Sequence, residues 1–287
     1  MDSSTMQRLQ RTHNHSPFVG LEFEDLDLSV ALSKETTEAI RSALAQYGVV
    51  FFRGQHLSPA QQLDFARQFA PVDRNRFFKA VDGYPEIAEV LKEAHQTSNI
   101  GGGWHTDHSY DQVPAMGSIL LAREVPPHGG DTLFINMAAV FESLSPGLQR
   151  TLESLQAIHS AKHVFGHEGR WARRADADGR ILNPDVVPED ARHPIVIKHP
   201  RSARKILYVN PGFTVRIDGW SDAESKALLD YLYKEAMRPE FQCRFHWTEG
   251  SIAFWDNLVT WHYALNDYHG YRRLMHRITV AGSALER

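Results

Sequence analysis

Six short apolar segments, separated by turn-forming residues, constrain the fold of this 287-residue chain more than any other feature. Each has the length of a strand and is rich in β-branched, aromatic or other apolar residues, whereas the clearest helix patterns gather near the two ends of the chain. The six segments occupy residues 117–124, 131–137, 193–200, 205–210, 251–257 and 272–282. This distribution predicts a mainly β core of two sheets rather than an alternating βαβ array.

Three further segments carry the signals of helix ends. Ser33 precedes an apolar-periodic run that stops at Gly48, which predicts a helix with a serine N-cap and a C-terminal glycine. Ser58 and Ser221 are each followed three residues later by Gln or Glu, the pattern of a capping box. Residues 49–55, "VVFFRGQ", follow the first helix and are expected to be a short buried strand. The predicted architecture is therefore a β core with flanking α-helices.

Composition excludes several classes of protein. A net charge of −4 gives no support for a nucleic-acid partner or a membrane surface, and no apolar run approaches the roughly 20 residues that span a bilayer. The single cysteine, Cys243, excludes an internal disulfide framework and fits a cytoplasmic protein. The chain contains no glycine-rich phosphate-binding loop of the dinucleotide or P-loop type.

The chain shows no internal repeat and no low-complexity linker, which predicts one domain. Residues 1–16 are expected to be a loose lead-in, and residues 17–287 the domain itself. One internal stretch, residues 166–192, is long, polar and charged. It is interpreted either as a lid over an active site or as a plain surface excursion.

A His-x-Asp pair, His105 and Asp107, stands in "GGGWHTDHSY". In a chain with 16 histidines, about two such pairs with an acidic residue arise by chance, so the pair alone is better explained as a surface histidine beside an aspartate. A third candidate ligand, His262, lies far downstream in an aromatic segment that also carries Arg273 and Arg277. Two imidazoles and one carboxylate on one face of a metal suit non-haem Fe(II), because three positions stay open for co-substrate and O2.

A rival group of histidines, His159, His163 and His167, has four-residue spacing and would share one face of a helix. This group lacks a carboxylate, and the residues between its members are poor helix formers. A structural role, or a hinge beside the 166–192 segment, is the preferred interpretation.

Four motifs resemble those of one family. They are "WHTD", "GGDTLF", "HPIVIKHP" with "RKILYVNPGFTVRI", and "WDNLVTWHYALNDYHGYRRLMHR". In this order and spacing the chain resembles the Fe(II)/2-oxoglutarate-dependent dioxygenases of the TauD/TfdA (taurine and aryloxyalkanoate dioxygenase) family, from about residue 17 to the end. The resemblance implies a distorted double-stranded β-helix, the cupin-like jelly roll, which strand counting alone does not distinguish from a sandwich.

The resemblance also implies roles for individual residues. His105, Asp107 and His262 match the iron ligands of the family. Arg273 matches the arginine that binds the distal carboxylate of 2-oxoglutarate, and Thr132 matches its hydroxyl partner, although a threonine there can also simply begin a strand. Arg273 and the substrate-side Arg277 stand four apart in a run that alternates as a strand, so both side chains are expected on one face. His276, between them, is expected to point away and is assigned no role.

Six positions are expected to contact substrate. Arg277 matches the arginine that meets the anionic end of the substrate in taurine- and aryloxyalkanoate-type members. Phe213 and Trp247 match aromatic pocket residues and are equally compatible with plain core positions. His108, Arg76 and Lys79 depart from the taurine-type pattern and leave taurine doubtful as the substrate.

The implied activity is hydroxylation of a small anionic organic substrate, such as a sulfonate, an alkyl sulfate or an aryloxyalkanoate, with release of succinate and CO2. Hydroxylation of a carbon that bears S, O or N would cleave the substrate. A hydroxylase or desaturase of secondary metabolism would carry the same motifs, and a metallohydrolase or a non-enzymatic metal-binding jelly roll remains the rival class. Relatives suggest a homo-oligomer, a dimer or a tetramer, by analogy only.

Overall fold

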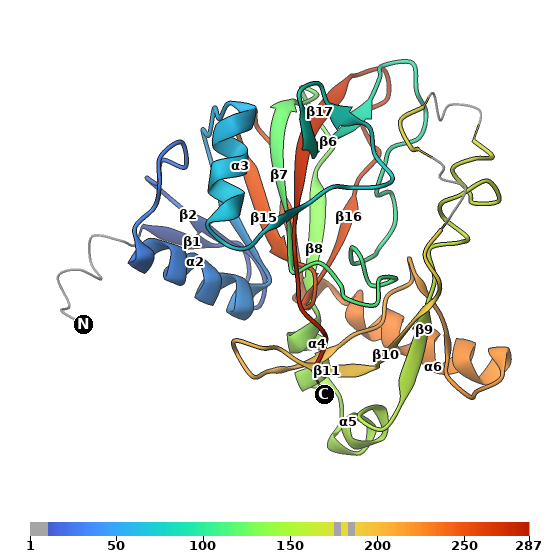
Figure 1. The fold of residues 1–287 in the computed structure, drawn as a ribbon. Coiled ribbons are helices and arrows are strands. Elements are labelled where there is room, and N and C mark those ends of the chain that lie inside the picture. The colour runs from blue at the N-terminus through green and yellow to red at the C-terminus, as the bar shows by residue number, and fades with distance from the viewer. Residues whose placement is uncertain (1–10, 175–178, 183–186, 287) are drawn as a thin grey trace.

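The computed structural model describes residues 11–174, 179–182 and 187–286 (Figure 1). Its largest sheet has nine strands, and within it only the β2–β3 pair is parallel. In spatial order the path runs β1 (Thr12–Asn14), β2 (Leu21–Phe23), β3 (Val49–Phe52), β15 (Ile252–Asp256), β7 (Gly117–Glu124), β17 (Arg273–Val280), β6 (Tyr84–Lys92) and β5 (Ala80–Val81), and β4 (Val72–Asp73) pairs with β17.

Smaller sheets complete the β structure. A three-stranded sheet, ordered β14 (Gln242–Phe245), β8 (Thr132–Asn136) and β16 (Thr260–Ala264), faces the large sheet. The others are β10 (Ala191–Pro194) with β9 (Gln156–His159) and β13 (Thr214–Ile217), and the pair β11 (Val196–Lys198) and β12 (Lys205–Leu207).

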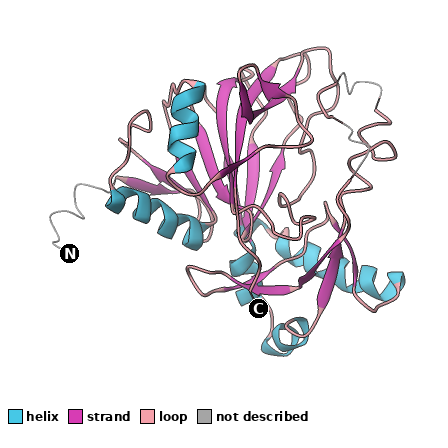
Figure 2. Ribbon diagram, in the orientation of Figure 1, coloured by secondary structure: helices cyan, strands magenta, loops and turns pink. Residues whose placement is uncertain are grey.

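Helices flank this core on two sides (Figures 1 and 2). They are α2 (Lys34–Tyr47), α3 (Pro59–Arg67), α4 (Met137–Ser143), α5 (Pro146–Leu152), α6 (Asp222–Ala236) and a 3₁₀ turn, Pro239–Phe241. The caps read from the sequence are confirmed, since Ser33 caps α2 and capping boxes begin α3 at Ser58 and α6 at Ser221. Among the described residues, no helix has the length and apolar character needed to cross a membrane.

The large sheet buries both of its faces. Alternate residues of one strand face opposite sides, so on β3 Val50 and Phe52 pack beneath α2 and α3, whereas Val49 and Phe51 face the three-stranded sheet. The ring of Phe51 stacks on that of Phe245 from β14 at 4.0 Å between centroids. Two sheets packed face to face with helices outside confirm the predicted mainly β, jelly-roll architecture.

Strand β17 shows the same alternation and points two predicted residues into the interior. Met275 belongs to the core between the two sheets, and Arg273 and Arg277, at equal parity with it, line a cavity there. His276 lies on the opposite face, where its Nδ1 accepts a hydrogen bond of 3.0 Å from Arg123. The predicted division of this strand into an arginine face and a His276 face is confirmed.

Several elements differ from the sequence-based expectation. The lead-in predicted over 1–16 contains β1 within its described part, and its residues 1–10 lie outside the described residues. The 193–200 run is two strands, because Ile195 is the point at which the chain changes partner from β9 to β12. The described parts of 166–192 are turns, bends and irregular chain, with one isolated β-bridge from Ile181 to Phe78, until β10 begins at Ala191. Residues 175–178 and 183–186 lie outside the described range.

Candidate active site

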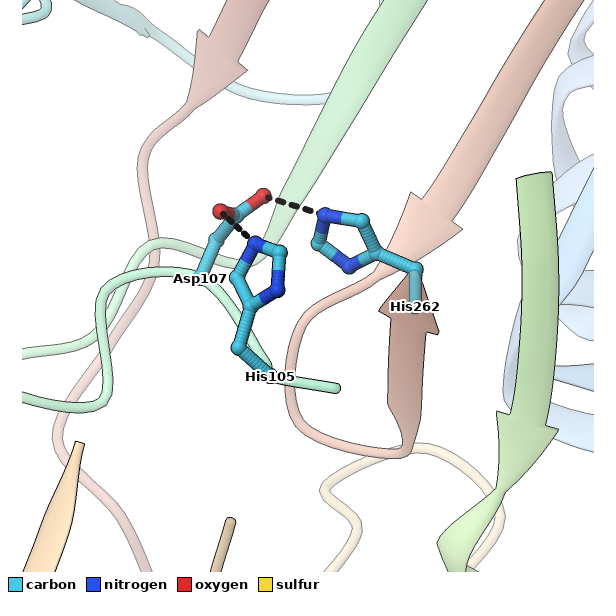
Figure 3. A group of neighbouring side chains, drawn as sticks. All are labelled: His105, Asp107 and His262. Atoms are coloured by element: carbon cyan, nitrogen blue, oxygen red, sulfur yellow. Dashed lines mark ion pairs between the residues drawn. The ribbon is translucent and has the colours of Figure 1, made fainter. Parts of the chain in front are cut away.

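Two histidines and one aspartate from distant parts of the chain converge in the interior (Figure 3). The Nε2 atom of His105 lies 3.7 Å from Oδ1 of Asp107, and Nε2 of His262 lies 3.8 Å from Oδ2 of the same carboxylate. One ligand atom from each residue fits within 4.8 Å of the others, the spacing that a single metal ion can bridge. Within the described part of the chain, no other His, Cys, Asp or Glu group has this arrangement.

Main-chain hydrogen bonds hold the two histidines side by side. The backbone N–H of His105 donates to the carbonyl of His262 at 3.2 Å, and the N–H of His262 donates to the carbonyl of His105 at 2.8 Å. His262 lies on β16, opposite Phe134 of β8, so the small sheet fixes one side of the pair. The loop that carries His105 is thereby attached to the sheet at the residue where its side chain is needed.

Both imidazoles are prepared to act as neutral ligands. The Nδ1 atom of His105 lies 2.8 Å from the carbonyl oxygen of Gly103, and because a carbonyl only accepts, Nδ1 carries the proton and Nε2 keeps its lone pair. Burial lowers the pKa of His105, and burial together with the nearby His105 lowers the pKa of His262 well below its usual value. Neither ring therefore needs to lose a proton before it binds a metal.

Asp107 is kept ionised by the guanidinium of Arg277. Burial by itself would raise the pKa of Asp107, but the positive charge of Arg277 beside it holds the pKa far below its usual range. Arg277 contributes an ion pair of 2.8 Å from Nη2 to Oδ2. The hydroxyl of Ser118 donates to the same oxygen at 3.1 Å and accepts from Arg277 at 3.2 Å.

The three side chains line a cavity of about 390 Å³ that also contains Arg273 and Thr132. Arg273 is buried, and its Nε and Nη2 atoms have no hydrogen-bond partner in the protein. Behind it, the indole N–H of Trp247 donates to Oγ1 of Thr132 at 2.9 Å, and the guanidinium of Arg273 lies 5.7 Å from the centroid of the Trp247 ring. Unused donors of a buried arginine beside an ordered hydroxyl are suited to an anionic group.

The opposite wall of the cavity is largely aromatic. Phe213 packs against Tyr110 with ring centroids 4.7 Å apart and lies 6.2 Å from the ring of His105. Phe165 and Trp171 bring a separate stretch of the chain, residues 164–171, onto the same wall. The described start of the 166–192 segment thus covers part of the cavity.

Four of the predicted substrate residues do not line the cavity. Trp247 lies behind Thr132, as described above. His108 binds Oδ2 of Asp111 at 2.9 Å through Nδ1, and Arg76 pairs with Oδ1 of the same carboxylate. Lys79 is mostly exposed and pairs with Glu89 at 3.7 Å. Their predicted contacts with substrate stay predictions, whereas Phe213 and Arg277 do lie on the cavity wall.

The rival histidines do not share a helical face. His159 ends strand β9 with Nδ1 3.3 Å from Oγ1 of Thr214, and His163 follows in a turn with Nε2 2.8 Å from the carbonyl of Gly212. His167 lies in a further turn and is exposed. The structural interpretation of this group agrees with the geometry.

Three residues at the site were not predicted from the sequence. Ser118 supports Asp107, Gly212 packs against His105, and Arg170 reaches the cavity wall from the 166–192 segment. Ser118 lies near the start of a predicted strand, on its inward-facing side. This position could have marked it as a polar residue in the interior. Gly212 stands in the motif "RKILYVNPGFTVRI", but its contact with His105 depends on the fold, and Arg170 stands in a stretch without periodicity.

Comparisons with known proteins agree with this geometry. The family described as "Taurine catabolism dioxygenase TauD, TfdA family" matches residues 10–279. An alkylsulfatase from Acinetobacter baylyi is 34% identical over 267 residues, 92% of this chain and 82% of its own. An alpha-ketoglutarate-dependent 2,4-dichlorophenoxyacetate dioxygenase from Cupriavidus pinatubonensis is 32% identical, covering 94% of this chain and 96% of its own.

A solved structure supports the same conclusion. The crystal structure of a putative alpha-ketoglutarate-dependent taurine dioxygenase from Burkholderia xenovorans superimposes with a TM-score of 0.80 at 34% identity, over 96% of this chain and 93% of that one. The expected dioxygenase, dependent on Fe(II), 2-oxoglutarate and O2, is confirmed. The chain belongs to the TauD/TfdA family of 2-oxoglutarate-dependent dioxygenases.

Proposed function

We propose that His105, Asp107 and His262 hold the Fe(II) ion of this enzyme. The donor set suits it, since two neutral imidazoles and one ionised carboxylate on one side leave positions open on the other. The support is the convergence of their ligand atoms within 4.8 Å, together with the tautomer that leaves Nε2 of His105 without a proton. Bound there, iron with 2-oxoglutarate and O2 supplies the oxidation of a substrate C–H bond, with release of succinate and CO2.

Arg273 and Thr132 bind the far carboxylate of 2-oxoglutarate in this proposal. Arg273 offers Nε and Nη2, both buried and without a partner, which is the paired-donor edge that a carboxylate accepts. The hydroxyl of Thr132 already accepts a hydrogen bond from Trp247, so its own proton is free to be donated to the carboxylate. These unused donors are the single observation that carries the choice of an oxygenase over a metallohydrolase.

The substrate is a small organic anion that binds between Arg277 and the aromatic wall. Arg277 keeps one buried nitrogen, Nε, without a partner, although Nη2 is engaged by Asp107 and Ser118. Phe213 and Phe165 offer an apolar surface to the body of the molecule. The names of the alkylsulfatase and 2,4-dichlorophenoxyacetate relatives, both at least 32% identical, support sulfate esters and aryloxyalkanoates as the classes to test.

The aromatic residues of the cavity wall favour oxidation of the bound substrate over side reactions. Phe213, Tyr110 and Trp171 exclude water from the space beside His105, and an enclosed site favours oxidation of the bound substrate over side reactions. Hydroxylation at a carbon that bears the sulfate or ether oxygen would cleave the substrate, and at another carbon it would leave the product intact. A hydroxylase or desaturase of secondary metabolism stays the second candidate, and it predicts activity on substrates without an anionic group.

The deciding experiment is an anaerobic titration of the iron-loaded protein with 2-oxoglutarate, followed in the visible spectrum. Chelation of iron by a 2-oxo acid gives a weak metal-to-ligand charge-transfer band, and we expect it in the natural protein and not in Asp107→Ala. Arg273→Ala should need far more 2-oxoglutarate. The matched control is Arg272→Ala, because Arg272 is the half-buried neighbour that pairs with Glu93 and Glu124 and does not line the cavity. A folded, iron-loaded protein without the band would overturn the proposal.

A cytoplasmic location and a homo-oligomeric assembly complete the proposal. The lone cysteine, Cys243, is buried and unpaired, which suits a reducing compartment. Light scattering of the purified protein measures the assembly directly.

A further inference from the structure

Arg170 is a charged residue of the cavity wall that the proposed function leaves without a role. The charged side chains of the wall, among the described residues, are Asp107, Arg170, Arg273 and Arg277. Arg277 is paired with Asp107, and Arg273 is assigned to 2-oxoglutarate. Arg170 is exposed at the cavity wall, and it forms no ion pair with a carboxylate in the described part of the chain.

The turn that carries Arg170 is well defined. Its backbone N–H donates to the carbonyl of His163 at 3.1 Å, and the next residue, Trp171, donates to the carbonyl of Val164 at 3.3 Å. Gly169 permits this return of the chain, because a β-carbon there would lie 2.5 Å from the carbonyl oxygen of Phe165. Trp171 is buried, with the guanidinium of Arg174 5.0 Å from its ring centroid. The Arg170 side chain thus starts from a fixed point on the wall.

The charge balance of the loaded cavity indicates what this arginine can bind. Three guanidiniums and one carboxylate leave the wall with two positive charges. The charges of Fe(II) and of the 2-oxoglutarate dianion cancel, so the excess of two remains when both are bound. A substrate with one anionic group satisfies Arg277 and leaves Arg170, an exposed residue of the cavity wall, without an anionic partner.

We propose that Arg170 binds a second anionic group, so that the substrate of this enzyme carries an anionic group at each end of an apolar body. One end meets Arg277 beside Asp107, and the other meets Arg170 where residues 164–171 form part of the cavity wall. Phe213 and Phe165 contact the hydrocarbon between them. The inference rests on the proposed function, because it assumes that Arg273 is occupied by 2-oxoglutarate.

The test uses two series of simple probes on the anaerobic protein loaded with Fe(II) and 2-oxoglutarate. One series is alkane monosulfonates of graded length, and the other is disulfonates with the same carbon chains and a sulfonate at each end. Binding is read as the perturbation of the visible iron–2-oxoglutarate band. We expect the best disulfonate to bind about tenfold more tightly than its monosulfonate, the usual gain from one charge-assisted contact.

Variants of Arg170 test whether this residue causes the tighter binding of the disulfonate. Arg170→Gln should abolish the preference for the disulfonate and change monosulfonate affinity by less than about twofold. Arg170→Lys, which keeps the charge, should retain most of the preference. The matched control is Arg173→Gln, since Arg173 is an exposed arginine of the same segment that does not line the cavity.

The outcomes separate the two proposals. Absence of the band before any sulfonate is added counts against the proposed function. If the band is present, the inference is overturned when no disulfonate binds more tightly than its monosulfonate. It is also overturned when Arg170→Gln weakens both series equally, or when Arg173→Gln removes the preference as well.

Discussion

The backbone of Gly212 lies directly against the side chain of His105. A β-carbon built on Gly212 would lie 2.6 Å from the β-carbon of His105 and 3.2 Å from Oδ1 of Asn210. Only glycine leaves room for the imidazole in its observed position, and the amide of Asn210 is itself held by donating to Ser109 and accepting from the backbone of Phe213. The aromatic wall and the proposed metal ligands are therefore joined through this turn.

Replacement of Gly212 by alanine should displace His105 and weaken Fe(II) binding by about tenfold, the usual effect of disturbing the support of a metal ligand. Anaerobic titration with Fe(II) measures the change. Gly147→Ala is the control, because a β-carbon on Gly147 meets nothing within 4 Å and that glycine lies in helix α5. Equal iron affinity in the two variants would show that the contact does not position His105.

Thr132→Val should raise the concentration of 2-oxoglutarate needed for half-saturation by about tenfold, because a donor to a carboxylate is lost without a change of shape. Thr132→Ser keeps the hydroxyl and should stay close to the natural protein. Trp247→Phe should have a smaller effect in the same direction, since the indole N–H fixes the direction in which the hydroxyl points. If valine and serine at position 132 behave alike, Thr132 does not bind the co-substrate.

The stability of the fold should decrease in mild acid because of His159. Burial lowers the pKa of this imidazole to about 3, whereas in the unfolded chain it titrates near ~6.5. Below the unfolded value only the unfolded chain takes up the proton, so the free energy of unfolding falls by about 1.4 kcal/mol per pH unit from this one group, and the loss ends near the folded value. Above that window both states hold a neutral ring and His159 contributes no pH dependence.

Urea unfolding between neutral pH and pH 5 measures this slope. His159→Phe removes the titrating group from the β9 position and should make the slope shallower by up to one proton. Parallel curves for the variant and the natural protein would contradict the assignment. Other buried imidazoles, such as His276, whose pKa is lowered to about 4 by burial and Arg123, account for part of the remaining dependence.

Cys243 should resist alkylation in the folded protein. Burial raises the pKa of its thiol to about 12, so the reactive thiolate is scarce at any physiological pH. Iodoacetamide at mildly alkaline pH should label it only after denaturant is added, which mass spectrometry detects. Rapid labelling without denaturant would mean that β14, where Cys243 packs against Phe134, opens readily.

Local patterns were sufficient to predict much of the fold. Alternation along residues 272–282 placed Arg273 and Arg277 on one inward face and His276 on the other, because strand geometry alone determines which side chains share a side. Helix ends at Ser33 and Ser58 were equally readable, since capping depends on residues within one turn. Strand β16, which carries His262, was not predicted as a strand, because its sequence "TWHYA" has no clear alternation.

Relations between distant residues could not be predicted from local pattern. The reciprocal backbone hydrogen bonds of His105 and His262 depend on how a loop meets the small sheet, and the two histidines were grouped in advance by ligand chemistry and by the family resemblance, not by local pattern. Arg76 was predicted near substrate by its position along the chain, but it pairs with Asp111, a contact decided by side-chain direction. Arg170 could not be predicted as a cavity residue for the same reason, because it stands in a polar stretch without a periodic pattern.

The ion pair between Arg277 and Asp107 has a consequence for how the enzyme is assembled in the cell. A buried carboxylate waiting for a metal would normally oppose folding, but here an internal cation already balances it at 2.8 Å. The polypeptide can therefore fold before it binds iron and acquire the metal afterwards. Iron scarcity would then leave a reserve of folded, inactive protein rather than a pool of chains destined for degradation.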